Sequence, residues 1–117
     1  MTDNWLKNGE SIIYKHDFKK KFTLVKISRE KHLNALNKDV ISSLSEVLDF
    51  IEKEPKIRCA ILTGEGDKAF VAGADIKEFQ SFKKKQANDL SYSGKQKLFN
   101  KIANFSKPII AAINGYA

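Results

Sequence analysis

The sequence contains one cysteine, Cys59, and two prolines in 117 residues. A single cysteine excludes a disulfide within the chain and any metal site made of several cysteines, and the isolated His16 and His32 add no metal-binding spacing. No apolar run reaches the ~20 residues that a membrane-spanning helix needs. Residues 1–20 also lack the apolar stretch of a secretory signal. We therefore expect a cytoplasmic protein with no bound metal and no membrane partner.

Acidic side chains are the minority among the charges. The chain has 21 basic and 14 acidic residues, a net charge of +7, and two lysine clusters at Lys19–Lys21 and Lys83–Lys85. Such an excess favours anionic partners, although lysine clusters are most often simply solvated surface. Neither cluster alternates with aromatic residues as a base-stacking platform does, so a nucleic-acid partner is not the first expectation.

Two extended segments are predicted near the start of the chain. Residues 1–10 are polar and turn-like, whereas 11–16 and 22–28 have the composition of strands. Residues 17–21 would form the hairpin between them, and 29–36 reads as a loop.

Residues 38–54 predict an amphipathic helix. Apolar side chains recur there at the i, i+3, i+4, i+7 spacing of one helix face, at Val40, Ile41, Leu44, Val47, Leu48 and Ile51. Asn37 is the expected N-cap, and Pro55 ends the helix because proline cannot continue it.

The second half of the chain alternates between strands and helices. A buried strand is predicted at 59–63, a shorter one at 70–72, and a strand at 109–113. Helices are predicted to begin at Asp75 and to span 86–104. This alternation indicates an α/β fold whose central strands are mainly parallel.

The segment Ala72-Gly-Ala-Asp75 lies where a strand is predicted to lead into a helix. The first turn of a helix has unpaired backbone N–H groups and the positive end of the helix dipole, and small side chains let a ligand approach them. Such a junction can stabilise an anion or a developing oxyanion. The same small residues also serve close packing, so this pattern is only weakly specific.

Four motifs together resemble the crotonase family, the enoyl-CoA hydratases and isomerases. They are LNALN at 33–37, ILTG at 61–64, AFVAGADIKEF at 69–79 and KPIIAAINGYA at 107–117. The resemblance runs from about residue 11 to the last residue. It implies the ββα spiral core of that family, with residues 1–117 as the N-terminal part of a single domain.

The resemblance also implies a site and a substrate. The backbone N–H of Ala74 matches one of two oxyanion-hole donors for an acyl-CoA thioester, which fits chemistry that passes through a thioester enolate. The positions matching the coenzyme A site are Lys31, Ala35, Ala74, Asp75, Ile76 and Lys77. Coenzyme A would enter as part of the substrate, with no permanently bound cofactor, and a homo-oligomer, trimeric or hexameric, is implied.

Two departures from the family pattern bear on function. The loop before LNAL reads Arg29-Glu-Lys-His32, which adds a negative charge where the coenzyme A phosphates are expected. In the family the second oxyanion donor and the two catalytic glutamates follow the segment that ends here at Ala117. The chain would then hold about half of the core and of the site, and we expect an exposed apolar edge at 109–113 that favours self-association.

Three functions remain open from the sequence. The first is a hydratase/isomerase-like enzyme of which this chain is the N-terminal part, with the glutamates supplied by a C-terminal half, a companion segment or a neighbouring chain. The second is a non-catalytic fragment that binds coenzyme A or assembles with partners. The third is a relative that binds RNA through lysines, for which Lys77 and Lys83–Lys85 are the candidates.

Overall fold

The computed structural model describes residues 5–71 and 93–115. Within these ranges, a short 3₁₀ helix, η1, spans Glu30–His32, and two α-helices accompany five strands. The α-helices are α1, Lys38–Lys53, and α4, Ser93–Ala103. The strands are β1, Leu6–Asn8; β2, Ile12–Asp17; β3, Phe22–Ile27; β4, Cys59–Gly64; and β5, Ile109–Ala111.

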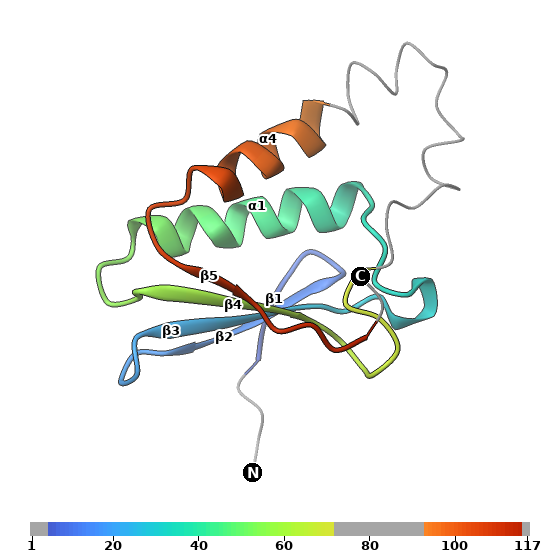
Figure 1. Ribbon diagram of the computed structural model, residues 1–117, viewed down its shortest axis with the longest axis horizontal. Helices are drawn as coiled ribbons and strands as arrows, with labels where there is room; N and C mark the ends of the chain where they lie inside the picture. Colours follow the sequence, from blue (N-terminus) through green and yellow to red (C-terminus); the bar gives the residue numbers. More distant parts are fainter. Residues whose placement is uncertain (1–4, 72–92, 116–117) are drawn as a thin grey trace.

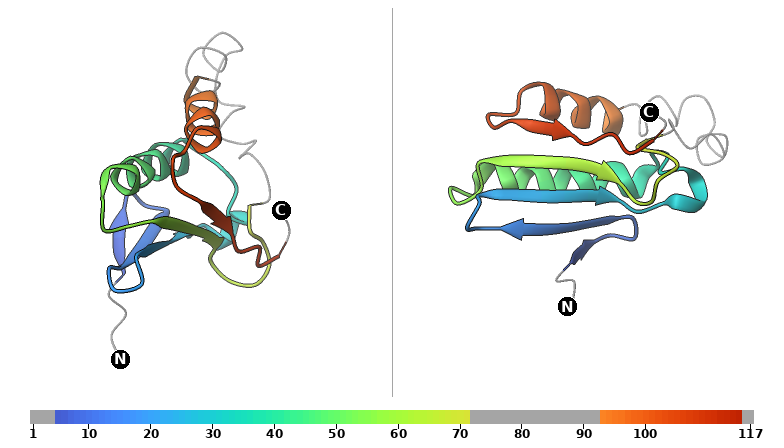
Figure 2. Two further views of the ribbon diagram at one scale, coloured as in Figure 1. Left: turned by 60° about the vertical axis from the view of Figure 1, so that its left-hand side comes forward. Right: turned by 60° about the horizontal axis from the view of Figure 1, so that its bottom comes forward.

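The strands form one sheet in the order β1-β2-β3-β4-β5. The first three are antiparallel, while β3, β4 and β5 run parallel, with Phe22 opposite Cys59 and Ala60 opposite Ile109. Both helices lie on the same side of this sheet (Figures 1 and 2). The α/β class and the parallel central strands predicted from the sequence are confirmed.

The core lies between α1 and the sheet. The predicted apolar face of α1 is buried, and alternate residues of β3, Thr23, Val25 and Ile27, point into the same layer. The side chain of Asn37 accepts a hydrogen bond of 2.8 Å from the Val40 N–H, which confirms the predicted N-cap. No helix in the described part of the chain is long and apolar enough to cross a membrane.

Several predicted boundaries were wrong. The segment expected to be turn-like contains β1, which pairs with β2 and is tied to α1 because Asn8 Nδ2 donates to the Ser43 carbonyl at 2.8 Å. Phe70 and Val71 lie outside any strand, and β5 ends at Ala111 rather than at residue 113. The helix expected from Asp75 and the first part of the helix expected at 86–104 lie outside the described residues.

Strand β5 forms one edge of the described sheet and carries apolar side chains on its surface. Ile110 is 51% exposed, and Ile113 just beyond the strand is 64% exposed. The predicted exposed apolar edge is therefore present. Self-association through it stays a prediction.

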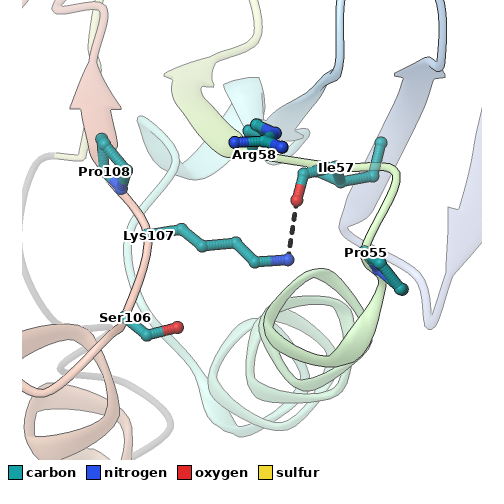
Figure 3. A pocket seen from close by; sticks show the side chains of 6 residues that line it. All are labelled: Pro55, Ile57, Arg58, Ser106, Lys107 and Pro108. Atoms are coloured by element: carbon teal, nitrogen blue, oxygen red, sulfur yellow. Dashed lines mark hydrogen bonds between the residues drawn. The ribbon is translucent and has the colours of Figure 1, made fainter.

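The start of β5 is fixed to the end of α1 by Lys107. Its ammonium donates to the carbonyls of Ile51, Glu54 and Ile57, at 2.6, 2.7 and 2.6 Å, so all three of its protons are used (Figure 3). A helix C-terminus leaves carbonyls without intrahelical partners and is the negative end of the dipole. A cation is therefore favourable at this point.

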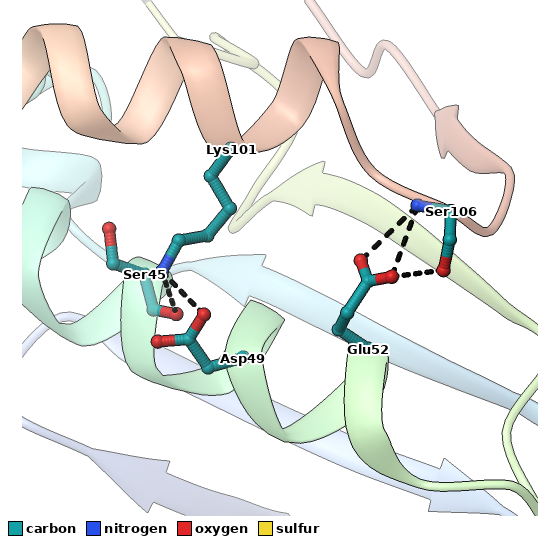
Figure 4. Close-up of polar contacts among 5 residues, drawn as sticks. All are labelled: Ser45, Asp49, Glu52, Lys101 and Ser106. Carbon is teal, nitrogen blue, oxygen red and sulfur yellow. Dashed lines mark hydrogen bonds and ion pairs between the residues drawn. The ribbon is translucent and has the colours of Figure 1, made fainter.

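Polar contacts also join α4 and the segment after it to α1 (Figure 4). Lys101 Nζ lies 2.5 Å from an oxygen of Asp49, and the backbone N–H and hydroxyl of Ser106 donate to the Glu52 carboxylate. These contacts place α4 alongside α1.

His16 on β2 packs against aromatic side chains. It is half-buried on β2, its Nδ1 lies 2.7 Å from the hydroxyl of the buried Thr23, and its ring contacts Phe18 and Phe50 at 5.2 and 5.1 Å between centroids. Burial lowers the pKa of the imidazole, an effect that the Glu54 carboxylate partly opposes. The neutral ring is thus the form that this packing favours.

Candidate functional site

The candidate site lies beyond the carboxyl ends of the three parallel strands. The segments that follow β3, β4 and β5 are 28–36, 65–71 and 112–115, and they meet at one end of the sheet (Figure 1). In sheets of this kind, ligands bind outside the carboxyl ends of the strands. The segment 72–75, which the sequence singled out, directly follows one of these three.

A tight turn places Asn34 beneath the loop that follows β4. After η1, Leu33 and Asn34 adopt positive φ angles of 53° and 55°, and Asn34 is only 1% exposed. Asparagine tolerates this left-handed conformation better than most residues. Its Oδ1 accepts from the Arg29 N–H at 2.8 Å, and its Nδ2 donates to the carbonyls of Ala69 and Glu65 at 2.8 and 3.1 Å.

Asn114 reaches the same loop from the segment after β5. Its Nδ2 donates to the carbonyls of Gly66 and Ala69 at 2.8 and 3.0 Å, and its Oδ1 accepts from the Gly64 N–H at 3.1 Å. The Ala69 carbonyl therefore accepts from two asparagine side chains that come from different segments. We call Asn34 and Asn114 the asparagine clamp.

Close packing around the clamp requires glycine at position 64. A Cβ there would lie 2.6 Å from the carbonyl oxygens of Ala69 and Phe70 and 2.7 Å from Nδ2 of Asn34. A carbonyl oxygen and a buried amide cannot move away cheaply at such distances. The glycine of the ILTG motif thus lets the loop fold back onto the end of β4.

The clamp holds the residues that lead into the segment 72–75. Asn34 and Asn114 fix the Ala69 carbonyl, and Phe70 and Val71 complete the described chain on this side. A segment that is to present backbone N–H groups to a ligand has to leave the sheet at a defined position. The described hydrogen bonds provide that fixed point of departure.

Of the six predicted site residues, Lys31 and Ala35 lie within the described part of the chain. Ala35 is buried, its carbonyl accepts from Nη1 of Arg29 at 2.7 Å, and it lies directly after the clamp residue Asn34. Lys31 is exposed on η1, at the same end of the sheet. Ala74, Asp75, Ile76 and Lys77 lie outside the described residues, as do Lys83–Lys85, so their proposed roles stay predictions.

Two glutamates, Glu30 and Glu65, lie close to the clamp. One oxygen of Glu65, Oε2, is buried and has no hydrogen-bond partner within the described part of the chain. Both Glu30 and Glu65 line a cavity of about 10 Å³ beside Asn34. The Glu30 carboxylate packs against Gly66, so its charge lies by the loop after β4. A cavity of this size is about that of one water molecule and is too small for a substrate.

The motifs were identified from the sequence, but the role of their two asparagines as a clamp was not predicted. Asn34 belongs to LNALN and Asn114 to the last motif, yet both were noted only as part of a resemblance. A usable signal was present, because asparagine is a residue that tolerates left-handed turns and whose amide can hold two segments together. Within residues 5–71 and 93–115, no group of three or more metal-binding side chains comes together.

Comparison with known proteins agrees with the geometry. A family model described as enoyl-CoA hydratase/isomerase matches residues 17–117. A crotonyl-CoA hydratase of Syntrophomonas wolfei is 39% identical over 108 residues, which cover 92% of this chain and 40% of that protein. A short-chain-enoyl-CoA hydratase of Clostridium acetobutylicum is 40% identical over 97 residues, covering 83% of this chain and 37% of that protein.

Solved structures show the same likeness. An enoyl-CoA hydratase from Bacillus anthracis has a TM-score of 0.76 and 34% identity, with 81% of this chain and 36% of that chain covered. Pseudomonas aeruginosa DspI has a TM-score of 0.84 and 25% identity, with 96% of this chain and 41% of that chain covered. The chain thus spans about two fifths of the length of these relatives.

Proposed function

The chain belongs to the enoyl-CoA hydratase/isomerase family, and from this membership we propose that it binds acyl-CoA thioesters and takes part in adding water to 2-enoyl-CoA. The observation that carries the proposal is the asparagine clamp at the carboxyl ends of the parallel strands. The clamp residues belong to two of the motifs that resemble the family, and they fix the Ala69 carbonyl, which precedes in sequence the segment with the proposed oxyanion donor. A cytoplasmic location and a homo-oligomer are part of the same proposal.

The chemistry requires stabilisation of a developing negative charge. When water adds to the carbon–carbon double bond of a 2-enoyl thioester, electron density moves onto the thioester oxygen and gives it enolate character. The backbone N–H of Ala74, at the start of a predicted helix, is proposed to donate to that oxygen. A general acid and a general base are also needed, and the family resemblance assigns them to positions after residue 117.

Binding of the coenzyme A part is proposed for the same end of the sheet. Lys31 is exposed there and would pair with a phosphate, while Ala35, which is buried, matches the small residue beside the coenzyme A part by resemblance. The described charges at this end are balanced, with Arg29, Lys31 and Lys68 against Glu30, Glu65 and Asp67. Recognition of the thioester would therefore rest on aimed backbone donors more than on a general positive field.

The test uses two substitutions at one position. Ala74→Pro removes the proposed N–H donor, whereas Ala74→Gly keeps it. The rate of crotonyl-CoA hydration is measured with the acid and base supplied by a companion segment or a neighbouring chain. We expect Ala74→Pro to lower this rate about 10²- to 10³-fold, followed as loss of enoyl absorbance, and Ala74→Gly to keep most of it. Equal loss in both variants would contradict the assigned role.

A binding measurement separates the enzyme from the non-catalytic alternative. Butyryl-CoA, which has no double bond to hydrate, can be titrated calorimetrically against the chain. Binding that Ala74→Pro weakens and Ala74→Gly does not supports the proposed function, and binding that neither substitution changes supports a fragment that holds only the coenzyme A part. No binding at all would overturn both.

A further inference from the structure

The end of the molecule opposite the candidate site is strongly basic. The hairpin after β2, the turn between α1 and β4, and the segment before β5 meet there (Figures 1 and 2). Seven cationic side chains lie in these segments, and all but the last are exposed: Lys19, Lys20, Lys21, Lys53, Lys56, Arg58 and Lys107. We call this surface the basic end.

Few carboxylates offset these charges. Three lie at the basic end, and each has a partner: Asp17 accepts from the Lys20 N–H at 2.8 Å, Glu54 from the Lys56 N–H at 3.4 Å, and Glu52 from Ser106. At the candidate site, by contrast, the described cations and carboxylates are equal in number. The charge of the described chain is thus concentrated at one end.

The six exposed cations are available to a partner. Within the described ranges none of them forms an ion pair, whereas Lys101 pairs with Asp49 elsewhere on the surface. Lys107 is different, because its three protons are all donated to carbonyls of the turn after α1. Arg58 lines a pocket of about 280 Å³ together with Lys107 (Figure 3). Unpaired, exposed cations keep their full attraction for an anionic surface.

An aromatic side chain stands among these lysines. Phe18 lies in the hairpin next to Lys19–Lys21 and is 49% exposed. Its ring is held by contacts with His16, at 5.2 Å between centroids, and with Lys56, whose Nζ lies 6.0 Å over the ring. The exposed part of the ring is therefore presented at a defined place by a rigid hairpin.

We propose that the basic end docks on a bilayer that contains anionic phospholipids, with the lysines at the headgroups and Phe18 in the interfacial layer. Clusters of lysines near a membrane surface are attracted by its negative potential, and aromatic rings favour the interface. The absence of a long apolar run excludes a spanning helix only, so the expectation of no membrane partner is revised for surface binding. This inference goes beyond the proposed function, and it leaves the candidate site at the opposite end open.

Lipid fits these residues better than nucleic acid does. Single-stranded nucleic acids bind along grooves in which open aromatic faces stack on bases. Here the Phe18 ring already contacts His16 and Lys56, and Arg58 is the one arginine among seven cations. Attraction to a charged bilayer depends only on how many cations there are and how closely they approach the surface.

The test is co-sedimentation of the chain with vesicles. Vesicles of phosphatidylcholine alone are compared with vesicles that also contain phosphatidylserine, at low and high sodium chloride. We expect binding only to the anionic vesicles and a loss of binding at high salt. The double substitution Lys19→Gln/Lys20→Gln is expected to weaken binding about 30-fold, and Phe18→Ser to weaken it further in the same background.

A matched control distinguishes vesicle binding by the basic end from binding that depends on net charge alone. Lys7→Gln/Lys97→Gln removes the same charge from exposed positions on β1 and α4, and it should leave vesicle binding nearly unchanged. Equal weakening by both double substitutions would overturn the proposal. So would binding to uncharged vesicles, or binding to polyuridylic acid with none to the anionic vesicles. Hydration of crotonyl-CoA measured on the same samples reports on the proposed function separately.

Discussion

The carbonyl oxygen of Ala69 accepts hydrogen bonds from two buried or half-buried amides, which is the most constrained point of the candidate site. Asn34 and Asn114 reach it at 2.8 and 3.0 Å from positions 35 and 45 residues away in the chain. An amide that holds several backbone groups is costly to remove because each group loses its partner. Single substitutions in the clamp should therefore affect the whole loop after β4.

Asn114→Leu tests this directly. It leaves the Gly64 N–H and the Gly66 carbonyl without partners, and we expect it to lower the free energy of unfolding by about 1–3 kcal/mol, measured by urea denaturation. The matched control is Asn104→Leu, because Asn104 is exposed and makes one local bond, to the Asn100 carbonyl at 2.9 Å. A loss no larger than that of the control would contradict the role of the clamp.

At single positions, some site residues could be predicted from the sequence, but the contacts of the clamp could not. Lys31, Ala35 and the residues 74–77 were assigned to the site by resemblance, and the N-cap Asn37 by a local rule that the structure confirms. The partners of Asn34 and Asn114 could not be predicted in the same way. Apart from the nearby Arg29 N–H, these partners lie tens of residues away, and the pairing depends on which strand ends meet in the sheet.

Helix α1 is secured at both ends, but by different means. Asn37 caps its start from the adjacent position, whereas Lys107 caps its end from a segment that is far away in sequence. Local caps and the apolar spacing explain why the helix was predicted with nearly correct bounds. Strand β1 was missed because its polar residues are extended only through pairing with β2.

Lys107→Met is expected to loosen the join between α1 and β5. The substitution keeps most of the apolar stem but removes the ammonium from three carbonyls. We expect the free energy of unfolding to fall by about 2 kcal/mol in thermal or urea denaturation. Lys101→Met is the control, since its ion pair with Asp49 is on the surface and should contribute less than about 1 kcal/mol. Similar losses in both variants would argue against a special role for Lys107.

The described chain has a buried core, an apolar edge at β5, a charge-balanced candidate site at one end of the sheet and the basic end at the other. The fold class, the parallel strands and the family were predicted from the sequence. The concentration of charge was not, because Lys19–Lys21, Lys53 and Arg58 come together only when the hairpin and the turn after α1 meet at one end of the sheet.

The exposed edge at β5 leads us to expect self-association. Unpaired strand edges with apolar side chains readily pair with another chain. Sedimentation equilibrium should show a species larger than the monomer, and Ile110→Lys/Ile113→Lys should reduce it. Leu6→Lys, at a half-exposed apolar position on the opposite edge strand, is the control and should change the association less. A monomer at every concentration would contradict the expectation.

The two residues of the asparagine clamp are also synthesised at different times. Chains grow from the N-terminus at roughly 5–20 residues per second, so Asn34 is already present when the ribosome adds Ala69. Asn114 follows 45 residues later, which corresponds to about 2–9 s of synthesis. During that interval the nascent chain can form the hairpin, α1 and β4, while the loop after β4 is held from one side only. Closure of the loop after β4 from both sides therefore waits until the segment that follows β5 has been made.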